Sequence, residues 1–192
     1  MLFLDIETLG TESTSVVLSV AMTVYKDNAP VTYQSFIDNG IFVKFDAKEQ
    51  INRYKRVTEQ HTLEWWSKQC DFAKKRSLVP SSEDVSAEQG IDQLNEWLRK
   101  IPNYKNMLCW TRGSLDQVCI DSLCNSIGKP KIIPYYNYRD VRTLIECFYP
   151  KQERGYVEVD KSKCPDYDFG KVIKHDPLHD VAYDAVMILA GV

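Results

Sequence analysis

Near its start the chain reads Leu2-Phe3-Leu4-Asp5-Ile6-Glu7-Thr8, and this stretch decides the fold. The run is apolar apart from two carboxylates, and it predicts a strand. Asp5 and Glu7 are two positions apart, so on a strand they share one face at roughly 7 Å spacing. Burying both unpaired would cost several kcal/mol or force protonation. A divalent cation would relieve that cost, although Asp-x-Glu by itself is better explained by acids on the protein surface.

The segments that follow predict a layered α/β domain. A turn-rich loop over 10–15 leads to a second strand over 16–25, and the alternation over 31–37 predicts a third, so the N-terminal part is expected to form an antiparallel meander. The remaining predicted elements are helices over 58–69, 86–100, 115–127 and 139–148, a short strand over 107–110, a helix from Pro177 to the C-terminus, and loops over 74–84 and 149–170. We expect a mixed sheet flanked by helices, in a single domain over residues 1–192.

Composition restricts the functional classes. The net charge of −3 argues against a protein that coats nucleic acid, which would carry a basic surface, but it does not exclude an enzyme that holds a few nucleotides beside bound metal. None of the six cysteines forms a CxxC pair, and there is no signal-peptide pattern, no run of membrane-span length and no P-loop. We therefore expect a cytoplasmic protein with mostly buried, reduced thiols and no membrane partner. An NTP-dependent helicase is not expected.

Asp116 is a candidate third carboxylate. It follows the predicted strand over 107–110 and the turn Arg112-Gly113-Ser114, at the start of a helix. An acidic residue in a first helical turn also stabilises the helix dipole, so Asp116 carries little weight alone.

The C-terminal part repeats a histidine five residues ahead of an aspartate, within His175-Asp176-Pro177-Leu178-His179-Asp180-Val181-Ala182-Tyr183-Asp184. The two registers are His175 with Asp180 and His179 with Asp184. Pro177 is favoured in a first helical turn, which leaves His175 on the preceding loop and places His179 inside the helix. We favour the first register and leave the second open. Asp184 shares a helix face with Asp180 and is expected to border the site.

Taken in order, these patterns resemble the DnaQ-like 3′-5′ exonucleases of the RNase H-like superfamily, in the DEDDh branch. That branch uses Asp-x-Glu on its first strand, an aspartate at the start of a middle helix, and His-x-x-x-x-Asp near the C-terminus. On this chain the resemblance assigns these roles to Asp5 and Glu7, Asp116, and His175 with Asp180.

A narrower resemblance is to the exonuclease A group of T-even bacteriophages and the related mycobacterial-type 3′-5′ exoribonucleases. It rests on Thr62-Leu63-Glu64-Trp65-Trp66-Ser67-Lys68-Gln69, Trp110-Thr111-Arg112-Gly113-Ser114-Leu115-Asp116, Arg139-Asp140-Val141-Arg142-Thr143 and the segment 175–184. The departures are Leu115, where an aromatic residue is usual, and Pro177, where alanine is usual; neither is a ligand.

The resemblance implies an RNase H-like fold and a metal-dependent 3′-5′ exonuclease that releases nucleoside 5′-monophosphates. Two Mg²⁺ or Mn²⁺ ions are implied, held by Asp5, Glu7, Asp116 and Asp180, with His175 as the general base. The phage-like motifs favour single-stranded DNA as substrate, with RNA as the alternative, and imply the cytoplasm of a bacterial host if the chain is phage-encoded. An inactive nucleic-acid-binding module and a non-nuclease metal-binding protein are the competing hypotheses, and the oligomeric state stays open.

Candidate substrate contacts are Thr8, Leu9, Trp66 and Arg112, with Phe45, Trp65, Trp110 and Arg142 as further possibilities. Aromatic side chains stack on bases and arginines contact phosphates. The spacing of Leu63 and Trp66 predicts instead that the two tryptophans face the core, and the basic run Lys74-Lys75-Arg76 predicts a solvated face.

Overall fold

A computed structural model describes residues 1–26, 29–149, 156–168, 170 and 172–191. Its centre is a five-stranded mixed sheet with the order β3-β2-β1-β4-β5. The strands are β1 (Leu2–Thr8), β2 (Val17–Val24), β3 (Ile41–Lys44), β4 (Cys109–Thr111) and β5 (Tyr138–Asp140). β1 pairs antiparallel with β2 and parallel with β4, so the opening stretch occupies the middle of the sheet.

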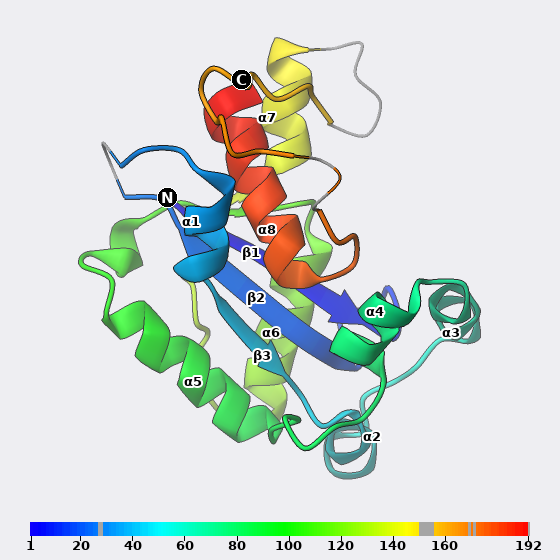
Figure 1. Cartoon of the computed structure of the whole chain (residues 1–192). Coiled ribbons are helices and arrows are strands. Elements are labelled where there is room, and N and C mark those ends of the chain that lie inside the picture. Colours follow the sequence, from blue (N-terminus) through cyan, green and yellow to red (C-terminus); the bar gives the residue numbers. More distant parts are fainter. Residues whose placement is uncertain (27–28, 150–155, 169, 171, 192) are drawn as a thin grey trace.

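Helices cover both faces of this sheet (Figure 1). The α-helices of the described residues are α1 (Tyr33–Asp38), α2 (Ala47–Tyr54), α3 (Gln60–Ser67), α4 (Asp71–Ala73), α5 (Ala87–Arg99), α6 (Leu115–Ser126), α7 (Val141–Phe148) and α8 (Pro177–Val186). Two π-helical turns, η1 (Lys74–Leu78) and η6 (Met187–Gly191), extend α4 and α8. Two short 3₁₀ turns, η2 (Tyr104–Asn106) and η3 (Tyr135–Asn137), precede β4 and β5. The expected RNase H-like mixed sheet, antiparallel at one side and parallel at the other, is confirmed.

The alternation of β1 divides the core between two helical layers. Leu2, Leu4 and Ile6 pack in one cluster with residues of α5 and α6. Phe3 packs in the other, with α1, α7 and α8. Because successive strand residues point to opposite faces, Asp5 and Glu7 continue the Phe3 series and face the layer that contains α8. The strand thus buries apolar side chains on one side and presents carboxylates on the other.

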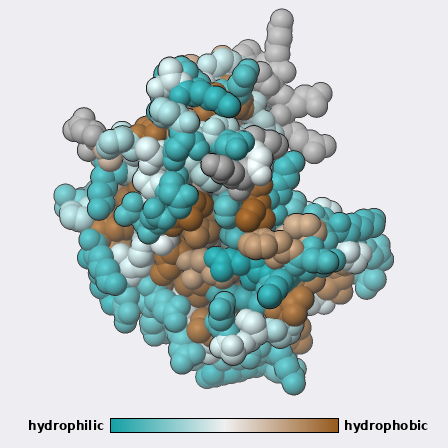
Figure 2. Space-filling model, viewed as in Figure 1, coloured by the Kyte–Doolittle hydropathy of each residue, from teal (hydrophilic) through white to brown (hydrophobic). Residues whose placement is uncertain are grey.

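Figure 2, viewed as in Figure 1, shows a largely hydrophilic surface on which apolar side chains emerge mainly near the middle of this face, around α1 and α8. No helix within the described residues is long and apolar enough to cross a membrane. The cysteines are free, and four of the six are buried, as the sequence predicted.

The predicted strand over 31–37 is wrong. Tyr33–Asp38 is a helix, and the side chain of Thr32 caps it by accepting a hydrogen bond from the Ser35 backbone N–H at 3.3 Å. Tyr33, Phe36 and Ile37 are spaced three and four apart, which is a helical period. The third strand of the antiparallel part is instead the short β3, which the prediction omitted along with α2.

Three further predictions need correction. Residues 139–148 are not one helix, because Tyr138–Asp140 pairs with β4 before α7 begins. The predicted loop over 74–84 starts with the π-helical turn η1, whose Arg76 pairs with Asp176 at 3.1 Å instead of lying on a solvated face. Within 149–170, predicted to be exposed, the described part buries Val157, Val159, Cys164 and Tyr167, while 150–155 and 169 lie outside the described residues.

Candidate active site

The two carboxylates of β1 lie where the strand changes register. The pairing with β2 shifts between Glu7 and Thr8, so that Glu7 is opposite Ser19 and Thr8 is opposite Val17. The extra residue is Leu18 of β2, so the regular pairing of β1 is interrupted directly after Glu7. Glu7 is buried, and Asp5 has a carboxylate oxygen, Oδ2, that is buried without a hydrogen-bond partner among the described residues.

A tight turn brings Asp116 to the same edge of the sheet. β4 runs parallel to β1, and Gly113 then adopts a left-handed φ of +94°, where glycine is favoured over other residues. The Thr111 hydroxyl donates to the Gly113 carbonyl at 2.7 Å, and the Gly113 N–H donates to Asp140 Oδ1 at 3.0 Å. Asp116 follows in the first turn of α6 and is 6% exposed.

The third contribution comes from the loop that precedes α8. Asp176 caps this helix by accepting a hydrogen bond from the Leu178 N–H at 3.0 Å, and Pro177 is its first residue. His175 has a left-handed φ of +65°, and its N–H donates to Asp180 Oδ2 at 3.0 Å. A positive φ is uncommon outside glycine, so this hydrogen bond helps to hold a turn that aims the ring at β1.

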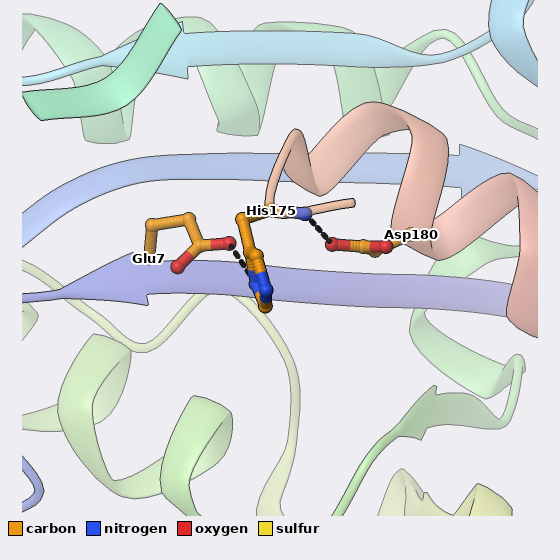
Figure 3. A group of neighbouring side chains, drawn as sticks. All are labelled: Glu7, His175 and Asp180. Atoms are coloured by element: carbon orange, nitrogen blue, oxygen red, sulfur yellow. Dashed lines mark hydrogen bonds and ion pairs between the residues drawn. The ribbon is translucent and has the colours of Figure 1, made fainter. Parts of the chain in front are cut away.

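Figure 3 shows the result: the imidazole of His175 lies between Glu7 and Asp180. His175 Nδ1 is 3.8 Å from Glu7 Oε1. One potential ligand atom from each of these three residues lies within 4.8 Å of the others. The His175 side chain is 36% exposed, so it remains open to solvent.

The carboxylates repel one another. Burial is the main cause that raises the pKa of Asp5 well above its ordinary range, and the charges of Asp116, Asp180 and Glu7 raise it further. Burial, followed by Asp180 and Asp116, likewise raises the pKa of Glu7. The pKa values of Asp116 and Asp180 rise to about 7, mainly through burial and then through Asp184. This combination of causes is typical of functional sites and of cation sites without their cation.

The pKa of His175 moves the other way. Burial lowers it, and the neighbouring Lys174 lowers it further. A lowered pKa keeps the imidazole neutral at neutral pH, and a neutral ring nitrogen can accept a proton.

The second histidine register is directed elsewhere. His179 Nδ1 lies 2.8 Å from the Tyr33 hydroxyl, on α1. Asp184 is bound by the guanidinium of Arg112, with Arg112 Nε at 3.1 Å from Asp184 Oδ1. The structure therefore brings His175 and Asp180 together with Glu7 and gives His179 and Asp184 other partners. Asp184 still borders the cluster, because its charge contributes to the raised pKa of Asp5.

The candidate substrate contacts lie mostly within the protein. Leu9 and Trp66 are buried together in one apolar cluster, and the Trp66 indole donates to the Thr8 carbonyl at 2.9 Å. The Thr8 hydroxyl donates to the Gly10 carbonyl at 2.6 Å, and Arg112 is held by Asp184. These four side chains therefore have structural contacts in place of open surface.

The further candidate substrate contacts include both buried and exposed side chains. Phe45 is buried at 1% exposure, and Trp110 packs against the apolar layer around α8. Trp65 is 39% exposed, against the expectation that both tryptophans face the core. Arg142 is exposed, and its backbone N–H donates to Asp140 Oδ1 at 3.1 Å.

Sequence reasoning missed one contact of His175. The Trp65 and His175 rings lie edge to face, with centroids 4.7 Å apart and an interplanar angle of 82°. The adjacent tryptophans in the sequence could have indicated this contact. Neighbouring residues of a helix point in different directions, so Trp65 does not face the core when Trp66 does.

The fold and these residues define a class. A mixed sheet carrying Asp-x-Glu on its central strand, with a further aspartate and a His–Asp pair beside it, is the DEDDh class of RNase H-like nucleases. Residues 1–191 match the family described as the 3′-5′ exoribonuclease Rv2179c-like domain. The chain belongs to this family, and it is a 3′-5′ exonuclease.

Two similar proteins support this assignment. An exodeoxyribonuclease of Enterobacteria phage T4 is 29% identical over 203 residues, which cover 96% of this chain and 86% of that protein. The nuclease domain of 3′hExo, described as a DEDDh family member bound to rAMP, matches 97% of this chain and 90% of its own with a TM-score of 0.57. At 15% identity the second likeness concerns the fold. The predicted relationship to DnaQ-like exonucleases is confirmed.

Proposed function

We propose that residues 1–192 form one exonuclease domain that degrades single-stranded DNA from its 3′ end, with two divalent cations and His175 as general base. The observation that carries the proposal is the meeting of Asp5, Glu7, Asp116 and Asp180 beside His175. The DEDDh family generally uses divalent metal ions, which agrees with this donor set.

The residues fit a cation on physical grounds. The buried Oδ2 of Asp5 is a hard oxygen donor that has no hydrogen-bond partner in the part of the chain that the structure describes. Mg²⁺ and Mn²⁺ favour such carboxylate oxygens. Asp5, Glu7, Asp116 and Asp180 would hold the ions through their carboxylate oxygens. When bound, the ions hold the attacking and leaving oxygens and offset the negative charge of the site.

The protein's own part in hydrolysis is proton transfer and orientation. A ring nitrogen of His175 accepts a proton from the water that attacks the phosphorus of the terminal nucleotide. The bond from that phosphorus to the 3′ oxygen of the preceding nucleotide breaks and releases a nucleoside 5′-monophosphate, and the departing 3′ oxygen takes a proton from solvent water to become the new 3′ hydroxyl. Asp180 orients the histidine through the backbone N–H of His175.

RNA is the second candidate substrate, favoured by the description of the family as exoribonucleases. DNA is favoured by the phage exodeoxyribonuclease, which is similar over almost the whole chain. Discrimination between the two depends on contacts to the 2′-hydroxyl.

Digestion of matched oligonucleotides tests the proposal. DNA and RNA of one sequence, 5′-labelled, single- or double-stranded, are incubated with the protein and Mg²⁺ or Mn²⁺. We expect a ladder that shortens from the 3′ end, fastest on single-stranded DNA, with nucleoside monophosphates as products. Faster degradation of RNA than of DNA would show that RNA is the preferred substrate. Full activity in excess EDTA, or in Asp5→Asn, would overturn the proposed metal mechanism.

A further inference from the structure

We propose that Trp65 is a positioning residue for His175, holding its imidazole in the orientation required for proton transfer. The inference rests on the proposed role of His175 and concerns how a histidine on a loop is kept in one place. Its test separates failure of that role from failure of the Trp65 inference.

Two indole rings connect the interior to His175. Trp66 is completely buried, and its indole N–H donates to the Thr8 carbonyl on β1 at 2.9 Å. The Trp65 ring lies edge to face against Trp66, with centroids 5.2 Å apart, and against His175, with centroids 4.7 Å apart. Trp65 therefore spans the distance between an anchored core residue and the histidine.

This chain of rings starts beside a proposed metal ligand. Thr8, which binds Trp66, follows Glu7 directly, and Glu7 Oε1 lies 3.8 Å from His175 Nδ1. Helix α3, which carries both tryptophans, lies beyond the end of β1 (Figure 1). Two sets of contacts therefore connect His175 to β1. One is its contact with Glu7, and the other runs from Thr8 through Trp66 and Trp65.

The loop needs such support. His175 has a left-handed φ, and its side chain is 36% exposed. Within the described residues, the imidazole of His175 lies against Glu7 and against the indole of Trp65. An edge-to-face aromatic pair is directional, so removal of the indole leaves the imidazole free to change its rotamer. Small displacements of a catalytic group cost large factors in rate.

The exposed part of Trp65 allows one competing role. Trp65 is 39% exposed, and an exposed indole can stack on a base of the substrate. The two roles differ in their kinetics. A stacking platform contributes to binding and raises KM when removed, whereas a positioning residue raises the barrier of the chemical step and lowers kcat.

The experiment compares Trp65→Ala, Trp65→Phe, His175→Ala and the double variant on single-stranded oligonucleotides with Mg²⁺. We expect Trp65→Ala to lower kcat by about 10- to 100-fold with KM changed by less than about threefold. Trp65→Phe keeps an aromatic edge and should recover most of kcat. In the His175→Ala background, the loss of Trp65 should have no further effect on kcat, because residues acting through one group are not additive.

Leu63→Ala is the matched control, since Leu63 is on the same helix and is 38% exposed. It should leave kcat and KM unchanged, and all variants should keep the Mg²⁺-induced increase in melting temperature if they are folded. An effect of Trp65→Ala confined to KM, or one that persists in the His175→Ala background, would overturn the inference in favour of base stacking. A His175→Ala variant with wild-type kcat would instead overturn the proposed general base.

Discussion

His175 and His179 have similar sequence contexts but different contacts in the structure. Both stand five residues ahead of an aspartate, but His175 contacts Glu7 and Asp180 while His179 binds the Tyr33 hydroxyl at 2.8 Å. The difference arises from the start of α8 at Pro177, which leaves only the first histidine on the loop.

This placement predicts different effects for the two alanine variants. His175→Ala should lower kcat by about 10²- to 10⁴-fold, the usual contribution of a general base. His179→Ala should change kcat by less than severalfold and lower the free energy of unfolding by about 1 kcal/mol, because one hydrogen bond to α1 is lost. Single-turnover rates and urea denaturation measure the two quantities. The reverse pattern in the rates would select the other register.

Asp116 predicts a pH dependence of the stability of the metal-free protein. Its pKa is raised from 3.8 to about 7, so the folded protein binds this proton more tightly than the unfolded chain. The contribution to stability is complete below about pH 4 and is lost as the pH rises through about 7. Asp116→Asn, which cannot ionise, should therefore match the wild type near pH 4 and exceed it in melting temperature at pH 8.

Comparison of the two proteins in EDTA cancels the titration of groups that the charge of Asp116 does not affect, including His175 and His179, whose lowered pKa values act in the opposite sense. A constant difference in melting temperature between pH 4 and pH 8 would contradict the assigned cause.

At the scale of elements, α8 is the helix whose start determines the geometry of the site. Asp176 caps it and also binds Arg76 of η1 at 3.1 Å, so one side chain fixes both the start of the helix and its distance from the neighbouring turn. Asp180 and His175 depend on that position through the hydrogen bond between them.

Removal of this cap should affect both stability and activity. Asp176→Ala should lower the free energy of unfolding by about 1–2 kcal/mol, as expected for the loss of a helix N-cap, and should lower kcat as well. Ser86→Ala is the matched control, because Ser86 caps α5 with a capping box on the far side of β1 from the carboxylates. It should cost a similar stability and leave kcat unchanged. Equal rates for the two variants would show that the start of α8 does not control the site.

Elements also show where sequence patterns were sufficient. Helices α5 and α6 were predicted within one or two residues, since Ser86 caps the first and a glycine turn precedes the second. The segment 31–37 was misassigned because a short apolar pattern fits a period of two or of 3.6. β3 and β5 have four and three residues, and such short strands are specified mainly by the neighbours with which they pair.

At the scale of the whole molecule, the crowded carboxylates predict that divalent cations stabilise the fold. Mg²⁺ or Mn²⁺ should raise the melting temperature, and a concentration about 100 times Kd should add about 2.7 kcal/mol to the free energy of unfolding. Asp5→Asn should be more stable than the wild type in EDTA, because it removes one repelling charge, and should show a much smaller cation effect. Differential scanning calorimetry across a cation titration measures both. An equal cation effect in the two proteins would place the binding elsewhere.

The sequence by itself determined the class of fold and the set of candidate ligands. Asp5, Glu7, Asp116 and the C-terminal histidines and aspartates occur in an order that is visible in one dimension. The periodicity of β1 also specified which side chains share a face, since alternation along a strand is a local property.

Only the tertiary structure determined which side chains contact one another. Arg112 and Asp184 are 72 positions apart and bind each other, and Arg76 reaches Asp176 across 100 positions. The approach of Trp65 to His175 likewise depends on how α3 and the loop before α8 meet beyond β1. Contacts of this kind follow from packing distant segments against one sheet, and no local pattern of residues encodes them.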